Sequence, residues 1–220
     1  ASNTPMRIGY KIEVSTQNLI FEGALQEAGI RYSSKLNDPQ SQITLINLYG
    51  AKNLIPALED GLIDGFVVMQ PFVALAEERF SGRAIAMLSE LPPQGKWKGS
   101  PCCALAARDS YVQLHPEISE ALTTLILRAN CFIAQEPKKS AAQIAKWLDV
   151  SIMVEEKSIP TIKFTIDFDE EWNSGVDFWV NSMIEAGKLT GTVKEAQAEG
   201  RLEQLMYNKS LYQNARSHFQ

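Results

Sequence analysis

The chain has 220 residues, of which 45% are hydrophobic and 21% are charged, a composition typical of a folded globular protein and not of a disordered or fibrous one. Its formal net charge of −5 and pI near 5.2 argue against general binding to nucleic acid or to an anionic membrane surface. No stretch reaches the roughly 20 apolar residues that span a bilayer, and the amino terminus lacks the basic and apolar regions of a signal peptide.

The first predicted elements are a strand and a capped helix. Arg7 to Ile12 predicts the strand, and the apolar positions between residues 19 and 25 predict a helix that Gly29 ends. Ser15 or Thr16 is expected to cap this helix, whose free N–H groups favour an anionic ligand group. Because such residues more often cap without any ligand, both roles stay open at this point.

Residues 31–77 contain a surface loop followed by a βαβα unit. The loop is polar and extends to residue 42, and Ile43 to Leu48 then predicts a strand. Leu54, Leu58 and Leu62 recur at the spacing of one helix face, and Phe66 to Met69 is a continuous apolar run of the kind found in central parallel strands. Pro71 fits the first turn of a helix from Phe72 to Arg79.

Polar and aromatic residues follow each of these three strands. Since the carboxyl ends of parallel strands meet at one edge of a sheet, where ligands of α/β proteins gather, we expect these residues to form a binding site. The aromatic wall of that site is expected from Tyr49 or Phe72. The candidate ligand-binding residues are Glu13, Ser15, Thr16, Gln17, Tyr49, Gly50, Gln70 and Phe72.

The middle of the chain contains two shorter strand candidates, at residues 84–88 and 102–107. Residues 90–101 between them are rich in Pro, Gly and Lys and predict a connector. Trp97 within it either caps a cleft or packs on a neighbouring lobe, and packing is favoured because buried aromatic residues are common. Cys102, Cys103 and Cys131 have neither disulfide nor zinc spacing, so buried and inert thiols are expected.

The second half of the chain predicts mainly helices. A helix begins at Pro116 and buries the stripe Ile118, Leu122, Leu125, Ile126 and Ala129, and another covers residues 141–148. Residues 163–168, KFTIDF, are typical of a strand, after which Asp169 caps a helix ending at Gly187. The acidic residues around Asp169 are explained by the helix dipole, so no metal site is predicted there. Terminal helices are expected from residue 192 onward.

No catalytic constellation is present. The only histidines are His115 and His218, neither of which is placed as a base for a Ser or Cys nucleophile. The phosphate-loop, dinucleotide and zinc-peptidase motifs are all absent from the sequence. We therefore predict no catalytic residue, no metal and no cofactor.

The chain resembles the periplasmic substrate-binding proteins of ABC importers for nitrate, aliphatic sulfonates, taurine and thiamine-pyrimidine precursors. The resemblance rests on RIGYKIEVST, ALEDGLIDGFVVMQPFVALAE, AARDSYVQLHPE and the helices through Trp147, which together cover about residues 6 to 150. It implies an α/β, type II periplasmic-binding-protein fold in which two lobes close on the ligand. A complete α/β lobe is expected over residues 6–97, and a return segment with an incomplete, partly helical lobe over residues 98–220, because the family's usual N-terminal first-lobe segment is missing before RIGYKI.

The resemblance also implies a function. The protein is expected to capture a small anion or heterocycle between its lobes and deliver it to a membrane permease, in the periplasm or outside the cell, without catalysing a reaction. Three explanations of the incomplete second lobe stay open: the chain is a fragment or a designed protein, a partner chain or strand swap completes the lobe, or the protein is a reduced relative with a different pocket. Two alternatives stay open: an enzyme on the same fold, similar to menaquinone-pathway lyases or pyrimidine synthases, and a ligand-sensing domain of a larger receptor.

Overall fold

The computed structural model describes residues 4–80, 82–99 and 101–218, and these divide into two compact units. The first unit comprises residues 1–98 and 145–158, and the second comprises residues 99–144 and 159–220. The chain thus passes between the units three times. Residues 145–158 return to the first unit, a feature that the predicted boundary between residues 97 and 98 does not include.

A four-stranded sheet forms the centre of the first unit. Its strand order is β2-β3-β1-β4, and every neighbouring pair is parallel. Tyr10 at the end of β1 lies in register with Asn47 of β3 and Val67 of β4, so these strands end at the same edge. The strands are β1 (Met6–Tyr10), β2 (Tyr32–Ser33), β3 (Ile43–Asn47) and β4 (Gly65–Val67).

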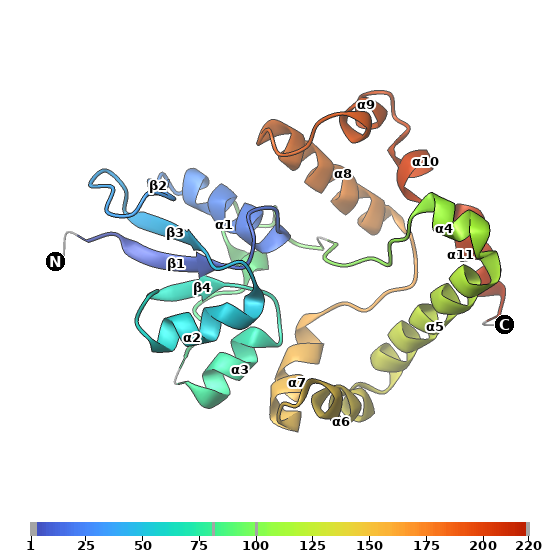
Figure 1. The fold of residues 1–220 in the computed structure, drawn as a ribbon, viewed down its shortest axis with the longest axis horizontal. Helices are drawn as coiled ribbons and strands as arrows, with labels where there is room; N and C mark the ends of the chain where they lie inside the picture. Colours follow the sequence, from blue (N-terminus) through green and yellow to red (C-terminus); the bar gives the residue numbers. More distant parts are fainter. Residues whose placement is uncertain (1–3, 81, 100, 219–220) are drawn as a thin grey trace. The chain divides into compact units, whose positions relative to one another are not determined.

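Helices cover both faces of this sheet, α1 on one side and α2 and α3 on the other (Figure 1). The α1 face buries Ile8, Tyr10, Leu45 and Val67, with Phe21 of α1 packed against them. The opposite face buries Leu54, Ala57, Ile63 and Val68. The helices of this unit are α1 (Thr16–Glu27), α2 (Leu54–Glu59), α3 (Phe72–Arg79), α7 (Ile152–Ser158) and the last turn of α6 (Pro137–Leu148).

Side chains along β1 alternate between the two faces of the sheet, and Gly9 occupies the face that packs on α2. Its neighbours Ile8 and Tyr10 point to the α1 face, and a Cβ atom at Gly9 would lie 2.7 Å from Cδ1 of Ile63 on the other face. The absence of a side chain therefore lets the α2 core approach the strand closely.

Several predictions for this unit are confirmed, and others are wrong. The strands at residues 7–12 and 43–48 and the helix from Phe72 to Arg79 are present, with Pro71 just before that helix. β4 pairs only with β1 among the described residues, so it is an edge strand and not a central one. Leu62 lies beyond the end of α2 and is exposed, because Gly61 adopts a left-handed conformation with φ of 66°.

Two further corrections concern residues outside the predicted strands. The loop after α1 contains the short strand β2, which pairs with the start of β3. Residues 84–88 form no strand, and Ile85 is 86% exposed. Trp97 packs, as the sequence favoured, but on α1 of its own unit and not on a neighbouring lobe: its ring is buried against Gly23, where an added Cβ would lie 2.7 Å from Cη2.

The second unit is helical, and none of its described residues lies in a strand. The predicted cap is confirmed, because Oδ1 of Asp169 accepts a hydrogen bond of 2.8 Å from the backbone N–H of Trp172. The terminal helices predicted from residue 192 onward are also present, as α9, α10 and α11. The helices are α4 (Asp109–Leu114), α5 (Pro116–Gln135), the first turns of α6, α8 (Glu170–Glu185), α9 (Thr192–Ala198), α10 (Leu202–Met206) and α11 (Lys209–Ser217).

Aromatic contacts hold the C-terminal helices of this unit to the segment before α8. The ring of Phe168 stacks on Tyr207 with centroids 4.7 Å apart and contacts Tyr212 at 4.8 Å. Nε1 of Trp172 donates to the Tyr207 hydroxyl at 3.0 Å, and Arg216 forms an ion pair with Asp167. α11 packs along α5 in the same unit.

The predicted strands of the second unit are wrong. Residues 102–107 and 163–168 are in neither strand nor helix. Cys102 and Cys103 are exposed rather than buried, while Cys131 is half-buried within α5. The helix from Pro116 is confirmed, but its predicted core stripe is exposed, with Leu122 at 45% and Leu125 at 61%.

Candidate functional site

The predicted ligand-binding residues all belong to the first unit and follow the carboxyl ends of β1, β3 and β4. Tyr10 links two of these junctions. Burial raises the pKa of its phenol. Electrostatic repulsion from Glu13, Glu22 and Tyr49 raises this pKa further. Glu13 and Tyr49 therefore both lie within electrostatic reach of the Tyr10 phenol at the end of β1.

The junction after β1 is built around the first turn of α1. Ser15 is the N-cap, with its Oγ 3.3 Å from the backbone nitrogen of Asn18, and it is 7% exposed. Its hydroxyl therefore caps the helix, as the sequence indicated. Gln17 is buried, Thr16 is half-buried and Glu13 is exposed, so Glu13 and Thr16 present the more accessible side chains of this junction.

Asn18 is a residue of this junction that the sequence analysis missed. It is fully buried, and its Nδ2 donates to the carbonyl oxygen of Glu13 at 3.3 Å and to Oε1 of Glu22 at 2.7 Å. These bonds tie the loop after β1 to α1. A polar residue within an apolar helical stretch was the available signal, because buried amides are normally hydrogen-bonded.

The junction after β3 presents an aromatic side chain. Tyr49 has φ of 54° and is 82% exposed, and its backbone N–H donates to Oδ1 of Asn47 at 3.0 Å. The left-handed conformation is uncommon for a residue with a side chain, and such residues gather at functional sites. Gly50 follows with φ of 155°, a value that a side chain disfavours.

The junction after β4 is formed by Gln70 and the start of α3. Oε1 of Gln70 accepts a hydrogen bond of 3.1 Å from the backbone N–H of Ala74. Met69 beside it connects to β1, since Nζ of Lys11 lies 3.7 Å from its sulfur atom. Phe72 packs against the core of Leu54, Ala57, Ile63 and Val68, so Tyr49 is the aromatic ring that this edge presents to solvent.

This edge favours an acceptor or anionic group in a ligand. Neither α1 nor α3 has an acidic residue in its first turn, so the positive end of each helix dipole is not neutralised from within the helix. Lys11 adds a cation, whereas Glu13 and Glu22 add carboxylates. The arrangement suits reversible binding of a small polar molecule by hydrogen bonds and dipoles.

The described residues contain no group of three or more His, Cys, Asp or Glu side chains placed to hold a metal ion. Three of the four acidic residues near the start of α8 have other partners, since Asp169 caps the helix, Asp167 pairs with Arg216 and Glu171 pairs with Lys163. Within the described part of the chain, no helix is long and apolar enough to cross a membrane.

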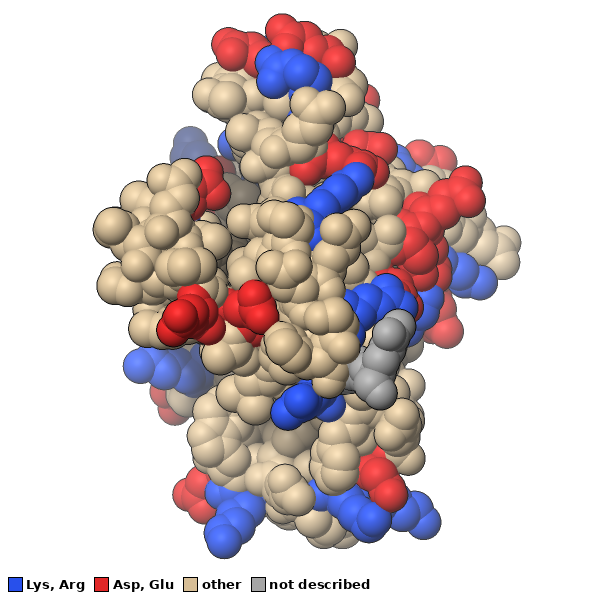
Figure 2. Space-filling view, turned by 90° about the vertical axis from the view of Figure 1, so that its right-hand side faces the viewer, with Lys and Arg blue, Asp and Glu red and all other residues tan. Residues whose placement is uncertain are grey.

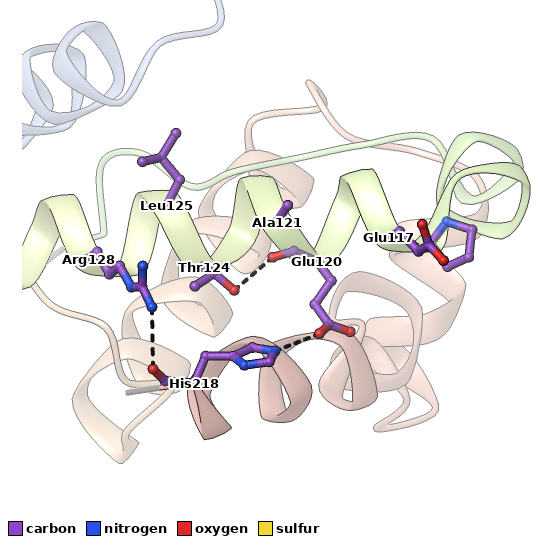
Figure 3. A pocket seen from close by; sticks show the side chains of 8 residues that line it. Glu117, Glu120, Ala121, Thr124, Leu125, Arg128 and His218 are labelled. Carbon is purple, nitrogen blue, oxygen red and sulfur yellow. Dashed lines mark hydrogen bonds and ion pairs between the residues drawn. The ribbon is translucent and has the colours of Figure 1, made fainter. Parts of the chain in front are cut away.

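A hollow of about 620 Å³ lies in the second unit between α5 and α11 (Figure 3). Nε2 of His218 lies 2.8 Å from Oε1 of Glu120, and Arg128 points at the carbonyl oxygen of His218 at 3.5 Å. No predicted site residue lines it. On the face drawn in Figure 2, acidic and basic side chains are scattered with uncharged surface between them.

Comparison with known proteins gives a family and two distant relatives. A model of the NMT1-like family matches residues 1–149. A nitrate import ATP-binding protein of Synechocystis is 30% identical over 119 residues, and a bicarbonate transport ATP-binding protein of Synechococcus elongatus is 26% identical over 121 residues. These matches cover 53% and 54% of this chain, which spans 17% of the length of each relative.

No solved structure matches the chain. The family match covers more than half of the 220 residues and includes the whole sheet with its three strand ends. The chain therefore belongs to the NMT1-like family, the nitrate-, sulfonate- and taurine-binding periplasmic proteins with the type II periplasmic-binding fold.

Proposed function

We propose that the protein reversibly binds a small oxyanion or a polar heterocycle at the carboxyl edge of its sheet and delivers it to the permease of an ABC importer. Family membership supports a solute-binding role in importers of the nitrate and sulfonate type. The proposed binding residues are Glu13, Ser15, Thr16, Gln17, Tyr49, Gly50, Gln70 and Phe72.

The observation that carries this proposal is the convergence of three strand ends on one edge. In-register pairing places the residues after Tyr10, Asn47 and Val67 together, and helices α1 and α3 both begin there. Backbone N–H groups at helix starts bind oxyanions without a full positive charge. The exposed ring of Tyr49 offers a flat surface on which a heterocycle can stack.

Within the proposed site, the residues divide by role. Ser15 and Gln17 are buried, so their effect on a ligand is to hold the first turn of α1 in place. Thr16, Tyr49 and Gln70 are the groups proposed to contact the ligand directly. Phe72 supports α3 from the core side.

The same proposal places the protein outside the cytoplasmic membrane, in the periplasm or the extracellular space, where it meets the permease and, through it, the ATP-binding subunit. The names of the relatives, which refer to nitrate import and bicarbonate transport, make nitrate and bicarbonate the first ligands to test.

A second candidate function is a ligand-sensing domain joined to the ATP-binding protein of an importer. Both relatives are ATP-binding transport proteins, and this chain resembles a stretch that makes up 17% of each. Its own sequence has no phosphate-loop motif, so it corresponds to a solute-binding and not a nucleotide-binding part.

Thermal shift and calorimetry with nitrate, bicarbonate, ethanesulfonate, taurine and a pyrimidine test the binding. A ligand at 100 times its dissociation constant raises the free energy of unfolding by about 2.7 kcal/mol. Tyr49→Ala should weaken binding at least tenfold if the ring contacts the ligand, while Tyr111→Ala, an exposed tyrosine of the second unit, should leave it unchanged. If none of the ligands stabilises the folded chain, the proposal is wrong.

Reconstituted importer separates the two candidates. A delivery protein increases ligand uptake when it is added to vesicles that contain the permease and the ATP-binding subunit. A sensing domain instead changes ATP hydrolysis in response to ligand without increasing uptake.

A further inference from the structure

Gln70 is fixed in one orientation by its neighbours. Its Oε1 atom accepts from the backbone N–H of Ala74 at 3.1 Å, and only the oxygen of an amide can accept from an N–H group. The Nε2 group must therefore point away from the start of α3. No described residue accepts a hydrogen bond from it.

Ser158 approaches the same oxygen from a distant part of the sequence. Its Oγ lies 3.4 Å from Oε1 of Gln70 and 2.6 Å from the carbonyl oxygen of Val154, and the side chain is only 1% exposed. A hydroxyl has one proton, so it donates mainly to Val154 and restrains Gln70 by contact and by a weak, shared hydrogen bond.

Helix α7 is held along α3 by two further contacts within the first unit. Ser151 donates a hydrogen bond to Oε1 of Glu78, and Nζ of Lys157 lies 3.8 Å from Oε2 of Glu77. These contacts position the end of α7, and with it Ser158, beside Gln70. The chain therefore returns to the first unit at a point where it touches a proposed ligand-binding residue.

We propose that Ser158 is a positioning residue, which holds Gln70 so that its Nε2 group donates to an acceptor oxygen of the ligand. This inference rests on the function proposed above and adds to it a residue outside the predicted site. Ordering a flexible side chain during binding costs about 0.5–1.5 kcal/mol. A Gln70 that is ordered beforehand avoids this cost, which corresponds to an affinity about two- to twelvefold higher.

A double-mutant cycle on the full chain tests the coupling. Ser158→Ala should weaken binding of the oxyanion that most stabilises the wild type two- to twelvefold. In the Gln70→Ala background the same substitution should have no further effect, because Ser158 acts through Gln70. Equal losses in both backgrounds would show a general packing role and overturn the proposal.

Ser151→Ala is the matched control, since it removes the hydroxyl of the residue before α7, which contacts Glu78 of α3 but not Gln70. It should lower stability without changing affinity. If it weakens binding as much as Ser158→Ala does, the effect belongs to the packing of α7 and the proposal is wrong.

A spectroscopic measurement on the ligand-free protein separates this inference from the proposed function. The order parameter of the Gln70 side-chain amide should be high in the wild type and fall in Ser158→Ala. An unchanged order parameter overturns the positioning role even where oxyanions bind. A wild type that binds no oxyanion overturns the ligand-facing role of Nε2, whereas the proposed function fails only if no heterocycle binds either.

Discussion

The first unit has an apolar core on both faces of a sheet, whereas several large apolar side chains on the helices of the second unit face solvent. Leu54 and Ile63 are at most 1% exposed in the two-sided packing of helices on the sheet. In the second unit, Leu114 of α4 is 75% exposed and Leu125 of α5 is 61% exposed. The difference lies in partners and not in the residues themselves, because an apolar stripe is buried only where a second surface packs on it.

The largest expected effect contrasts a leucine from each unit. Leu54→Ala should lower the free energy of unfolding by about 2–5 kcal/mol, because it leaves a cavity in a filled core. Leu125→Ala should change it by less than about 0.5 kcal/mol. Urea denaturation measures both, and a large loss in Leu125→Ala would mean that the α5 stripe is covered in solution.

The same contrast explains which elements could be predicted. β1, β3 and α3 were predicted because their signals are local: apolar runs, turn residues and a proline at the helix start. The caps Ser15 and Asp169 are equally local. Residues 102–107 and 163–168 have strand-like sequences, but a strand also needs a neighbour to pair with, and no described segment supplies one.

The candidate site shows a similar limit. Parallel topology was sufficient to predict that Ser15, Tyr49 and Gln70 follow strands that end at one edge. The backbone of Tyr49 and the contact between Gln70 and Ser158, 88 residues apart in the chain, depend on tertiary packing. Neither the backbone conformation of Tyr49 nor the contact between Gln70 and Ser158 can be predicted from the periodicity of the sequence.

Two helical glycines test how firmly the irregular segments are held in each unit. Gly23 faces Trp97, and Gly175 of α8 faces Pro101, so an alanine at either position meets the neighbouring ring. Each substitution should lower the free energy of unfolding by about 1–3 kcal/mol through overpacking. If Pro101 instead moves away from α8 easily, Gly175→Ala should raise the free energy of unfolding by about 1 kcal/mol, because alanine favours the helix over glycine. Urea denaturation gives the sign of the change and so distinguishes the two outcomes.

Glu155 extends the comparison to a buried charge in the first unit. It is 4% exposed, and burial raises the pKa of its carboxyl above the ordinary value of 4.5. A raised pKa in the folded state means that the contribution of this carboxyl to stability is greatest below pH 4.5. That contribution is lost as the pH rises through the folded-state pKa. Glu155→Gln should therefore be more stable than the wild type at pH 7, and this gain should vanish below pH 4.5.

Glu156 is the matched control, because it is the next residue of α7 and is exposed. Thermal unfolding of Glu156→Gln between pH 4 and 8 should follow the wild type. A gain in Glu156→Gln as large as that in Glu155→Gln would assign the effect to net charge and not to burial.

The smallest expected effect concerns the ion pair between Arg7 and Asp64, which joins the start of β1 to the residue before β4. The guanidinium and the backbone N–H of Arg7 both donate to the carboxylate, at 2.6 Å to Oδ1 and 2.8 Å to Oδ2, and hold the pKa of Asp64 below its ordinary value of 3.8. A lowered folded pKa means that the stabilisation is present above pH 3.8 and is lost as the pH falls through the folded value.

Asp64→Asn should therefore slightly lower the free energy of unfolding at pH 7. At strongly acidic pH, where Asp64 of the wild type is protonated, the variant and the wild type should be equally stable. Both side chains are more than a third exposed, so water and salt screen the pair and 1 M salt should remove most of the difference. Thermal unfolding at pH 7 with and without salt measures this. A loss comparable to that of Leu54→Ala would show that pairing of β4 with β1 depends on this contact, and that the first unit is held by more than its two apolar faces.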